Sequence, residues 1–258
     1  HLEKLIKHNE AAVISVKAVD NPSEFGVIVT EGDKVVRIIE KPLVPPAKTV
    51  NAGIYLFDAT IFEYIDRTQP SPRNEYEITD SMQMMVNEGI HVGFEPLTHV
   101  WLDVGRPWDM LDANKALLEK IKPSCEGTVE PLATLHGDVV IGEGSMIRNG
   151  AYIIGPVVIG KNCDIGPNCF IRPSTSIGNN VHIGNGVEVK NCVIMDGTKI
   201  GHLTYIGDSV VGYDCNFGAG TKVANLRHDG RNIKSIIKGK RVDTGRRKLG
   251  VIMGDDVH

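Results

Sequence analysis

Two residues that can transfer a proton or bind a polar ligand interrupt an apolar, glycine-rich stretch late in this sequence. They are His202 and Tyr205, in the segment GHLTYIGDS at 201–209. Histidine changes its charge near neutral pH and therefore suits a general base, whereas a phenol hydrogen-bonds to ligands. A histidine exposed on a surface is commonly only solvated, so this interpretation depends on the residues that accompany it.

Cationic and amide side chains accompany this histidine. Arg172 and Lys190 lie 30 and 12 residues before it, and Asn216 lies 14 residues after it, with Asn225 nine residues further on. Guanidinium, ammonium and amide groups are the donors that proteins use to bind phosphate. The set therefore suits a phosphorylated ligand held beside a proton acceptor.

A strongly basic segment follows at 225–250, NLRHDGRNIKSIIKGKRVDTGRRKLG. Its cations are Arg227, Arg231, Lys234, Lys238, Lys240, Arg241, Arg246, Arg247 and Lys248. The segment fits two interpretations, a solvated loop or a phosphate-binding rim beside the histidine.

These residues belong to a region in which apolar residues recur every six positions. The series is Ile141, Ile147, Ile153, Ile159, Ile165, Ile171, Ile177, Ile183 and Val189, and after two five-residue steps it continues through Ile194, Ile200, Ile206, Val211, Phe217 and Val223. A six-residue period is the signature of a parallel β-helix, whose inward residues stack from coil to coil. Glycine and asparagine suit the corners, where the backbone is left-handed.

Three such repeats complete one coil, so residues about one coil apart lie on neighbouring coils. We therefore expect several of the polar residues above to gather near one edge. The alternative is a rod that serves only as a spacer or for oligomerisation.

Residues 1–122 have the mixed pattern of an α/β domain. We expect a helix end at 1–9, a hairpin of strands at 25–29 and 34–40, a strand at 51–57 and a helix at 59–66. A further helix at 82–88 has Thr79 or Asp80 as its cap and ends at Gly89. Strands are expected at 90–96 and 98–104, and a helix from Pro107 to 122. Residues 123–133 resemble a linker before the β-helix of 134–258.

The composition excludes several classes of function. The net charge of −4 gives no indication of nucleic-acid binding, and no apolar run is long enough for a membrane span. No signal-peptide pattern is present. The five cysteines form no CxxC pair, which predicts reduced thiols in a cytoplasmic protein.

Residues 202–226, together with IRP at 171–173 and VEVK at 187–190, resemble the acetyltransferase domain of bifunctional sugar-1-phosphate nucleotidylyltransferase/acetyltransferases. These enzymes form UDP-N-acetylglucosamine, and the archaeal type is the most similar. The resemblance implies a left-handed β-helix that acetylates glucosamine 1-phosphate with acetyl-CoA. It implies that His202 is the general base. The implied ligands of the sugar phosphate are Arg172, Lys190, Tyr205, Asn216 and Asn225, with Arg231 and Lys234 in place of family lysines.

The first half resembles the nucleotidylyltransferase part of the same family. The matching segments are FGV at 25–27, EKP at 40–42, NAGIY at 51–55 and WLDVG at 101–105. The resemblance implies that N-acetylglucosamine 1-phosphate is coupled to UTP with Mg²⁺. Its implied contacts to the sugar or its phosphate are Gly26, Glu40, Lys41 and Asn51, and Asp103 is the implied Mg²⁺ ligand.

Two further segments of the family, a glycine-rich loop of the type GxGTRLxPLT and a GD motif, do not occur here. We therefore expect this chain to be the central piece of a longer one, and to be inactive in nucleotidyl transfer by itself. The resemblance also implies further coils that bind acetyl-CoA, and a homotrimer with acetyl-transfer sites between neighbouring copies.

Two other interpretations stay open. One is a nucleotidylyltransferase whose β-helix is structural or regulatory, and the other is an oligomerisation scaffold without catalysis. The sequence does not distinguish glucosamine from galactosamine, and it does not fix the nucleotide base.

Overall fold

The computed structural model describes all 258 residues, and the chain divides into two compact units, His1–Trp101 and Leu102–His258. Each unit has a hydrophobic core of its own. The longest helices have ten residues, too few for any of them to cross a membrane.

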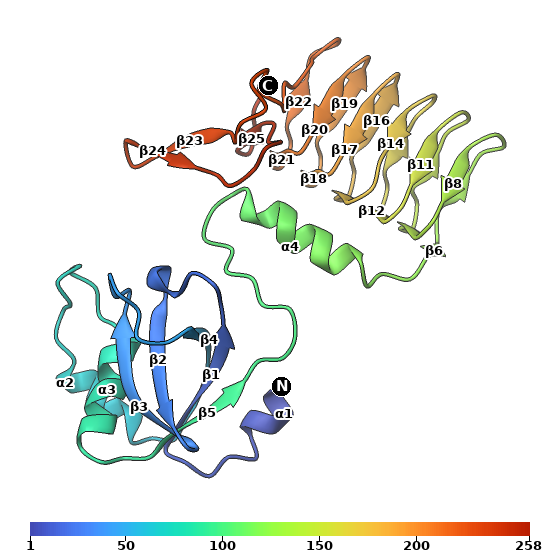
Figure 1. Ribbon diagram of the computed structural model, residues 1–258. Helices are drawn as coiled ribbons and strands as arrows, with labels where there is room; N and C mark the ends of the chain where they lie inside the picture. Colours follow the sequence, from blue (N-terminus) through green and yellow to red (C-terminus); the bar gives the residue numbers. More distant parts are fainter. The chain divides into compact units, whose positions relative to one another are not determined.

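The first unit is a small β-barrel with helices beside it (Figure 1). Its strands are β1 (Ala12–Ala18), β2 (Gly26–Glu31), β3 (Lys34–Glu40), β4 (Thr49–Phe57) and β5 (Val92–Pro96). Its helices are α1 (Leu2–Leu5), the 3-10 helix η1 (Pro22–Glu24), α2 (Ile61–Arg67) and α3 (Ile78–Asn87). The strand order is β1-β4-β2-β3-β5, and β5 pairs with β1. The expected α/β domain and the hairpin of β2 and β3 are confirmed.

The core of this unit lies between the sheet and α3. Met82 and Met85 of α3 are fully buried in one cluster with Ile14 and Ile28 from the strands. The amphipathic pattern of the helix thus covers the apolar face of the sheet, which removes both from water.

Two local predictions for this half are wrong. Neither Thr79 nor Asp80 caps α3, because the N-cap is Glu77 and it makes no side-chain cap hydrogen bond. Thr79 instead lies within the first turn, buried. The strand expected at 98–104 does not form, because this segment pairs with no strand.

The second unit is a left-handed parallel β-helix with three faces, in which the six-residue period predicts the stacked coils and the resemblance implies the left hand. The first face contains β7 (Thr128–Val129), β10 (Met146–Ile147), β13 (Asp164–Ile165), β16 (His182–Asn185), β19 (Lys199–His202) and β22 (Asn216–Phe217). The second, here called the β20 face, contains β8 (Thr134–His136), β11 (Tyr152–Ile154), β14 (Phe170–Ile171), β17 (Glu188–Lys190) and β20 (Tyr205–Gly207). The third contains β6 (Ser124–Cys125), β9 (Val139–Ile141), β12 (Val157–Ile159), β15 (Thr175–Ile177), β18 (Val193–Ile194), β21 (Val210–Val211) and β25 (Ile252–Met253).

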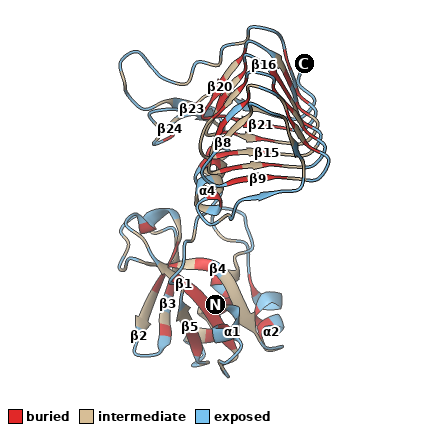
Figure 2. Ribbon diagram, turned by 90° about the vertical axis from the view of Figure 1, so that its right-hand side faces the viewer, coloured by how far each residue is buried: buried red, intermediate tan, exposed pale blue.

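The inside of the coils is filled by the residues of the six-residue series, and Figure 2 shows buried residues on every face of the stack. Ile147, Ile153, Ile165 and Ile171 are each 0% exposed. Corner positions carry left-handed residues, and those that are not glycine are mostly asparagine and aspartate. Examples are Asn162, Asn168, Asn180, Asn191, Asp208 and Asp214. Asparagine and aspartate tolerate this conformation better than other non-glycine residues, so the corners select them.

The β-helix begins earlier than the sequence suggests, because β6 and β7 lie within 123–133, where a linker was expected. The helix before it, α4 (Asp109–Leu118), also belongs to this unit. Trp108 and Leu111 are buried in a cluster with Val210 and Leu249. Asn114 donates a hydrogen bond to the carbonyl of Ser174 (3.0 Å) and accepts one from the Ser176 hydroxyl (2.5 Å). These contacts fix α4 on the coils, so the compact unit extends back to residue 102.

Between β22 and β25 the chain leaves the coils and forms an antiparallel hairpin of β23 (Lys234–Ile237) and β24 (Lys240–Asp243) (Figure 1). The basic segment is therefore an excursion from the β-helix. Where this segment returns to the coils, Lys248 forms an isolated antiparallel β-bridge with Leu226, near the point where the segment leaves them.

Candidate functional site

The β20 face brings together residues from three successive coils. Phe170, Glu188 and Tyr205 pair in register on β14, β17 and β20. Two residues further along, Arg172 follows β14, and Lys190 pairs with Gly207. Arg172 and Lys190 therefore occupy equivalent positions on neighbouring coils, as the repeat predicts.

A buried carboxylate, Asp208, joins the polar side chains at this end of the face. It is 3% exposed and accepts hydrogen bonds from Lys190 Nζ (3.1 Å to Oδ2), Asn191 Nδ2 (2.8 Å) and Asn225 Nδ2 (2.6 Å). An ionised carboxylate has only acceptor sites, so three donors satisfy it. Asp208 thereby fixes the side chains of Lys190 and Asn225.

Tyr205 belongs to the same network. Asn225 Nδ2 donates to Tyr205 Oη at 3.1 Å. Both groups lie over Gly207, where a Cβ would be 2.5 Å from Tyr205 Oη and 2.6 Å from Asn225 Nδ2. Glycine at this position leaves room for the tyrosine and the amide to meet above the backbone.

Arg172 is held from two sides. Its Nη1 donates to Glu188 Oε1 at 2.9 Å, and its guanidinium lies 5.7 Å from the centre of the Phe170 ring. The pair is more than one third exposed on each side, so the guanidinium remains open to an additional anion.

His202 lies at the corner before this face, at the end of β19. Its carbonyl accepts hydrogen bonds from the Thr204 hydroxyl (2.8 Å) and the Gly220 amide (3.0 Å), so its backbone is fixed. The imidazole is exposed. Three residues of β20 separate this corner from the level of Lys190, which corresponds to about 10 Å at a rise of roughly 3.3 Å per residue. His202 thus lies at the corner before β20, and the Arg172–Lys190 pair lies at the level where β20 ends.

The other predicted ligands are not in this cluster. Asn216 pairs with Lys199, at the end of β19 away from His202. Arg231 and Lys234 are exposed in the segment between β22 and β25. The backbone amide of Arg231 donates to Asp229 Oδ1, and Lys234 lies opposite Asp243 in the hairpin of β23 and β24.

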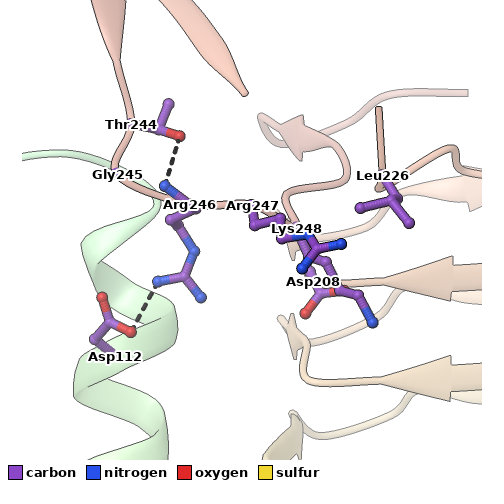
Figure 3. Close-up of a pocket in the computed structure, with 8 residues that line it drawn as sticks. All are labelled: Asp112, Asp208, Leu226, Thr244, Gly245, Arg246, Arg247 and Lys248. Carbon is purple, nitrogen blue, oxygen red and sulfur yellow. Dashed lines mark hydrogen bonds and ion pairs between the residues drawn. The ribbon is translucent and has the colours of Figure 1, made fainter. Parts of the chain in front are cut away.

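Two cavities adjoin the network on the side of α4. One of about 380 Å³ is lined in part by Arg172, Lys190 and Lys115, and one of about 800 Å³ is lined in part by Asp208, Arg247 and Lys248 (Figure 3). Arg246 and Asp112 line both cavities. Sequence patterns do not single out Lys115, Asp208 or Arg246, although Arg246 is one of the basic residues of 225–250.

The first unit brings together four predicted residues, Gly26, Glu40, Lys41 and Asn51. Gly26 pairs with Glu40 across the hairpin, and a Cβ on Gly26 would lie 2.8 Å from Glu40 Oε2 and 3.6 Å from Asn51 Cβ. Asn51 Nδ2 donates to Tyr55 Oη at 2.5 Å. Burial raises the pKa of Tyr55, so its phenol stays protonated.

Additional side chains surround Glu40. Thr79 Oγ1 donates to Glu40 Oε2 and Arg73 Nη2 to Glu40 Oε1, both at 3.4 Å. The hydrogen bond from Arg73 to Glu77 lowers the pKa of Glu77. Lys41 Nζ is 3.9 Å from Glu40 Oε1. The carboxylate of Glu40 therefore stands among donors that orient it.

Asp103, the predicted metal ligand, is exposed in the segment that follows Trp101. No group of three or more histidine, cysteine, aspartate or glutamate side chains in the chain is arranged to hold a metal ion. A carboxylate oxygen is nevertheless the donor that Mg²⁺ prefers, and this ion is commonly bound through one or two carboxylates together with substrate phosphates. A single aspartate fits that manner of binding.

Family comparisons agree with the division into two parts. Residues 1–120 match the family described as nucleotidyl transferase, and residues 153–258 match the family described as GMPPB C-terminal domain. Among solved structures, one described as a glucose-1-phosphate thymidylyltransferase from Bacillus anthracis in complex with a sucrose is 32% identical, with a TM-score of 0.40. That match covers 48% of this chain and 49% of the other.

Two curated relatives match almost the whole chain. The bifunctional protein GlmU of Methanocaldococcus jannaschii is 45% identical over 99% of this chain and 62% of its own length. A bifunctional sugar-1-phosphate nucleotidylyltransferase/acetyltransferase of Sulfurisphaera tokodaii is 45% identical over 98% of this chain and 63% of its own length. The chain thus spans somewhat less than two thirds of each relative. Across both units, the chain is therefore similar to bifunctional sugar-1-phosphate nucleotidylyltransferase/acetyltransferases.

Proposed function

We propose that the β20 face carries the sugar-phosphate site of an N-acetyltransferase, with His202 as its general base. The observation that supports this most is the network in which buried Asp208 holds Lys190 and Asn225 at the end of β20, whereas His202 lies at the corner before β20 begins. A sugar 1-phosphate has an anionic end and an amine end. The long side chains of Arg172 and Lys190 suit the former, and the exposed imidazole suits the latter.

In this proposal acetyl-CoA donates an acetyl group to the amine of glucosamine 1-phosphate. The amine must be neutral to attack the thioester carbonyl, and His202 accepts its proton. The new C–N bond forms as the C–S bond breaks, and the thiolate of coenzyme A leaves and takes up a proton. Tyr205 and Asn225 bind the sugar between the two ends, and Asn216, Arg231 and Lys234 are kept as proposed ligands from the resemblance.

The first unit is proposed to bind the sugar of a nucleotidyl transfer. The phosphate oxygen of N-acetylglucosamine 1-phosphate attacks the α-phosphorus of UTP, and pyrophosphate leaves. Glu40 accepts hydrogen bonds from the sugar, and the Asn51 amide forms hydrogen bonds with it. Gly26 leaves space for the sugar, and Lys41 forms an ion pair with the phosphate. Asp103, which follows the first unit in the chain, is the residue proposed to hold a Mg²⁺ ion, and that ion would neutralise charge on the transferring phosphates.

The assembly proposed for the complete protein is a homotrimer packed along its β-helices. Flat faces of stacked strands can bury against copies of themselves about a threefold axis. Sedimentation equilibrium of the complete protein at micromolar concentration tests this, since a trimer mass supports the proposal and a persistent monomer refutes it.

The principal test is a coupled assay on the complete protein. Acetyl-CoA-dependent release of free thiol in the presence of glucosamine 1-phosphate is the result expected, and the same assay with galactosamine 1-phosphate establishes the sugar. Pyrophosphate release from UTP and other nucleoside triphosphates establishes the base. Absence of thiol release with both sugars refutes the acetyltransferase.

One observation favours a second candidate function. The β-helix matches a family described as GMPPB C-terminal domain, which is not named for acetyl transfer. In this alternative the chain transfers only nucleotides, and the coils are structural or regulatory. Pyrophosphate release without any thiol release would establish it.

A further inference from the structure

Arg246 lies between α4 and the coils with part of its guanidinium unpaired. Its Nη1 donates to Asp112 Oδ1 at 2.8 Å, whereas its buried Nε has no hydrogen-bond partner (Figure 3). Nε of Arg246 is the only buried side-chain nitrogen or oxygen in the chain without a partner. An unsatisfied buried donor is unfavourable, so a ligand that reaches it gains a favourable interaction.

The backbone around Arg246 is fixed. Its amide donates to the Thr244 hydroxyl at 3.2 Å, and its carbonyl accepts from the Ile233 amide at 2.9 Å. The side chain is 16% exposed, whereas that of Asp112 is 58% exposed. The cation is therefore held in place, and its carboxylate partner is the more solvated member of the pair.

The surroundings of Arg246 are rich in positive charge. The cavity of about 380 Å³ that it lines with Asp112 also contains Arg172, Lys190 and Lys115. Its volume lies within the roughly 300–1,000 Å³ typical of small-ligand sites. Asp112 is the one carboxylate that lines it. A group with two negative charges and several acceptor oxygens matches this set better than the single carboxylate does.

We propose that Arg246 is a phosphate-binding residue of the candidate site, and that Asp112 is a resident counter-ion which a phosphate monoester displaces. The inference rests on the proposed function for the identity of the ligand, a sugar 1-phosphate. Because the Asp112 carboxylate is largely solvated, water compensates it when phosphate takes its place, which limits the cost of the exchange. Once the Asp112 carboxylate has left, phosphate oxygens bind Nη1 in its place and extend toward Nε, the buried donor without a partner.

The two residues of the pair then have opposite effects on affinity. Arg246→Gln removes a charge-assisted hydrogen bond and weakens sugar-phosphate binding at least roughly tenfold. Arg246→Lys keeps the charge without the planar fork and recovers only part of this loss. Asp112→Asn removes the competitor and tightens binding roughly two- to fivefold.

The experiment is titration calorimetry of the complete protein with glucosamine 1-phosphate, and with inorganic phosphate as a second probe. Glu119→Gln is the matched control, because it removes one carboxylate from the exposed end of the same helix and lines neither cavity. Unchanged affinity is expected for it. Thermal midpoints are recorded for every variant, so that unfolding of Arg246→Gln is recognised. Tighter binding by Asp112→Asn cannot result from unfolding, so this variant tests the inference independently.

Tighter binding by Asp112→Asn with an unchanged Glu119→Gln supports the inference. Weaker or unchanged binding by Asp112→Asn, or full affinity in folded Arg246→Gln, overturns it even if the wild-type protein acetylates its substrate. A different outcome would separate the two proposals. If Arg246→Gln weakens and Asp112→Asn tightens the binding of inorganic phosphate, but the protein releases no thiol, the proposed acetyl transfer is refuted and the phosphate site is supported.

Discussion

Lys190 Nζ donates a hydrogen bond to Asp208 Oδ2 at 3.1 Å, and the aspartate side chain is only 5% exposed. The same carboxylate binds the amide of Asn225, which lies 17 residues away in sequence. One buried carboxylate therefore orients the side chains of Lys190 and Asn225, which come from separate segments of the chain. The relationship links the packing of the coils directly to the geometry of the candidate site.

Asp208→Asn should raise the KM for the sugar phosphate in acetyl transfer, with a smaller effect on kcat. The substituted amide presents a donor to Lys190 and Asn225, so both side chains lose their fixed orientation. Removal of one partner of a buried ion pair also lowers stability, typically by about 3–5 kcal/mol. Steady-state kinetics and thermal midpoints measure the two effects separately.

A double-mutant cycle and a matched control separate positioning from stability. If Asp208 acts through Lys190, Asp208→Asn adds little to the KM defect of Lys190→Met. Asp196→Asn is the control, because Asp196 accepts two hydrogen bonds from Asn179 on the neighbouring coil, away from the network. Equal KM defects in Asp196→Asn and Asp208→Asn would show that the effect is only structural.

Asp103→Ala should abolish nucleotidyl transfer by the complete protein and leave acetyl transfer near the wild-type rate. The carboxylate is the proposed Mg²⁺ ligand, and it has no role in the proposed chemistry at His202. Pyrophosphate release and thiol release from one preparation provide the comparison. Loss of both activities in a folded variant would contradict the assignment of two separate sites.

The stacked isoleucines should carry much of the stability of the β-helix. Ile171→Ala, at a fully buried position, is expected to lower the free energy of unfolding by about 2–5 kcal/mol. Ile236→Ala, at a position that is 75% exposed, is expected to change it by less than about 0.5 kcal/mol. Urea denaturation monitored by circular dichroism tests this pair, and similar losses for both would contradict the stacking account.

The cysteines should differ sharply in reactivity. Cys125 is exposed, whereas the other four cysteines are buried, and burial raises the pKa of Cys169 and of Cys192 to about 12. Because the thiolate is the reactive form, raising the pH to about 8.5, the ordinary pKa of a free thiol, activates only a solvated cysteine. A thiol reagent should therefore modify one cysteine in the native chain and all five in denaturant. Rapid native modification of several thiols at that pH would contradict the burial.

The period of the inward residues predicts the β-helix well, because each repeat contributes one apolar residue to a local and regular stack. Ile171 and Ile206 therefore lie where the sequence places them. Arg172 and Lys190 follow the same register, so their proximity is also predictable.

Other features depend on contacts that no local pattern encodes. The amphipathic face of α4 predicts a partner but does not identify the coils as that partner, which is why the unit boundary was expected too late. Asp208 occupies a left-handed corner like Asp214, and only the tertiary structure distinguishes the corner that meets Lys190. Threonine is a common helix-capping residue, yet the Thr79 hydroxyl donates a hydrogen bond to Glu40 instead.

The central claim is that His202 accepts a proton during acetyl transfer, and the most direct measurement compares both activities of His202→Ala in the complete protein. We predict that thiol release falls roughly 10²–10⁴-fold, the usual contribution of a positioned general base. Nucleotidyl transfer and the thermal midpoint should stay near wild type, and the defect should shrink at high pH, where the amine is already neutral. Unchanged acetyl transfer in the folded variant, or an equal fall of both activities together with the thermal midpoint, would contradict the account.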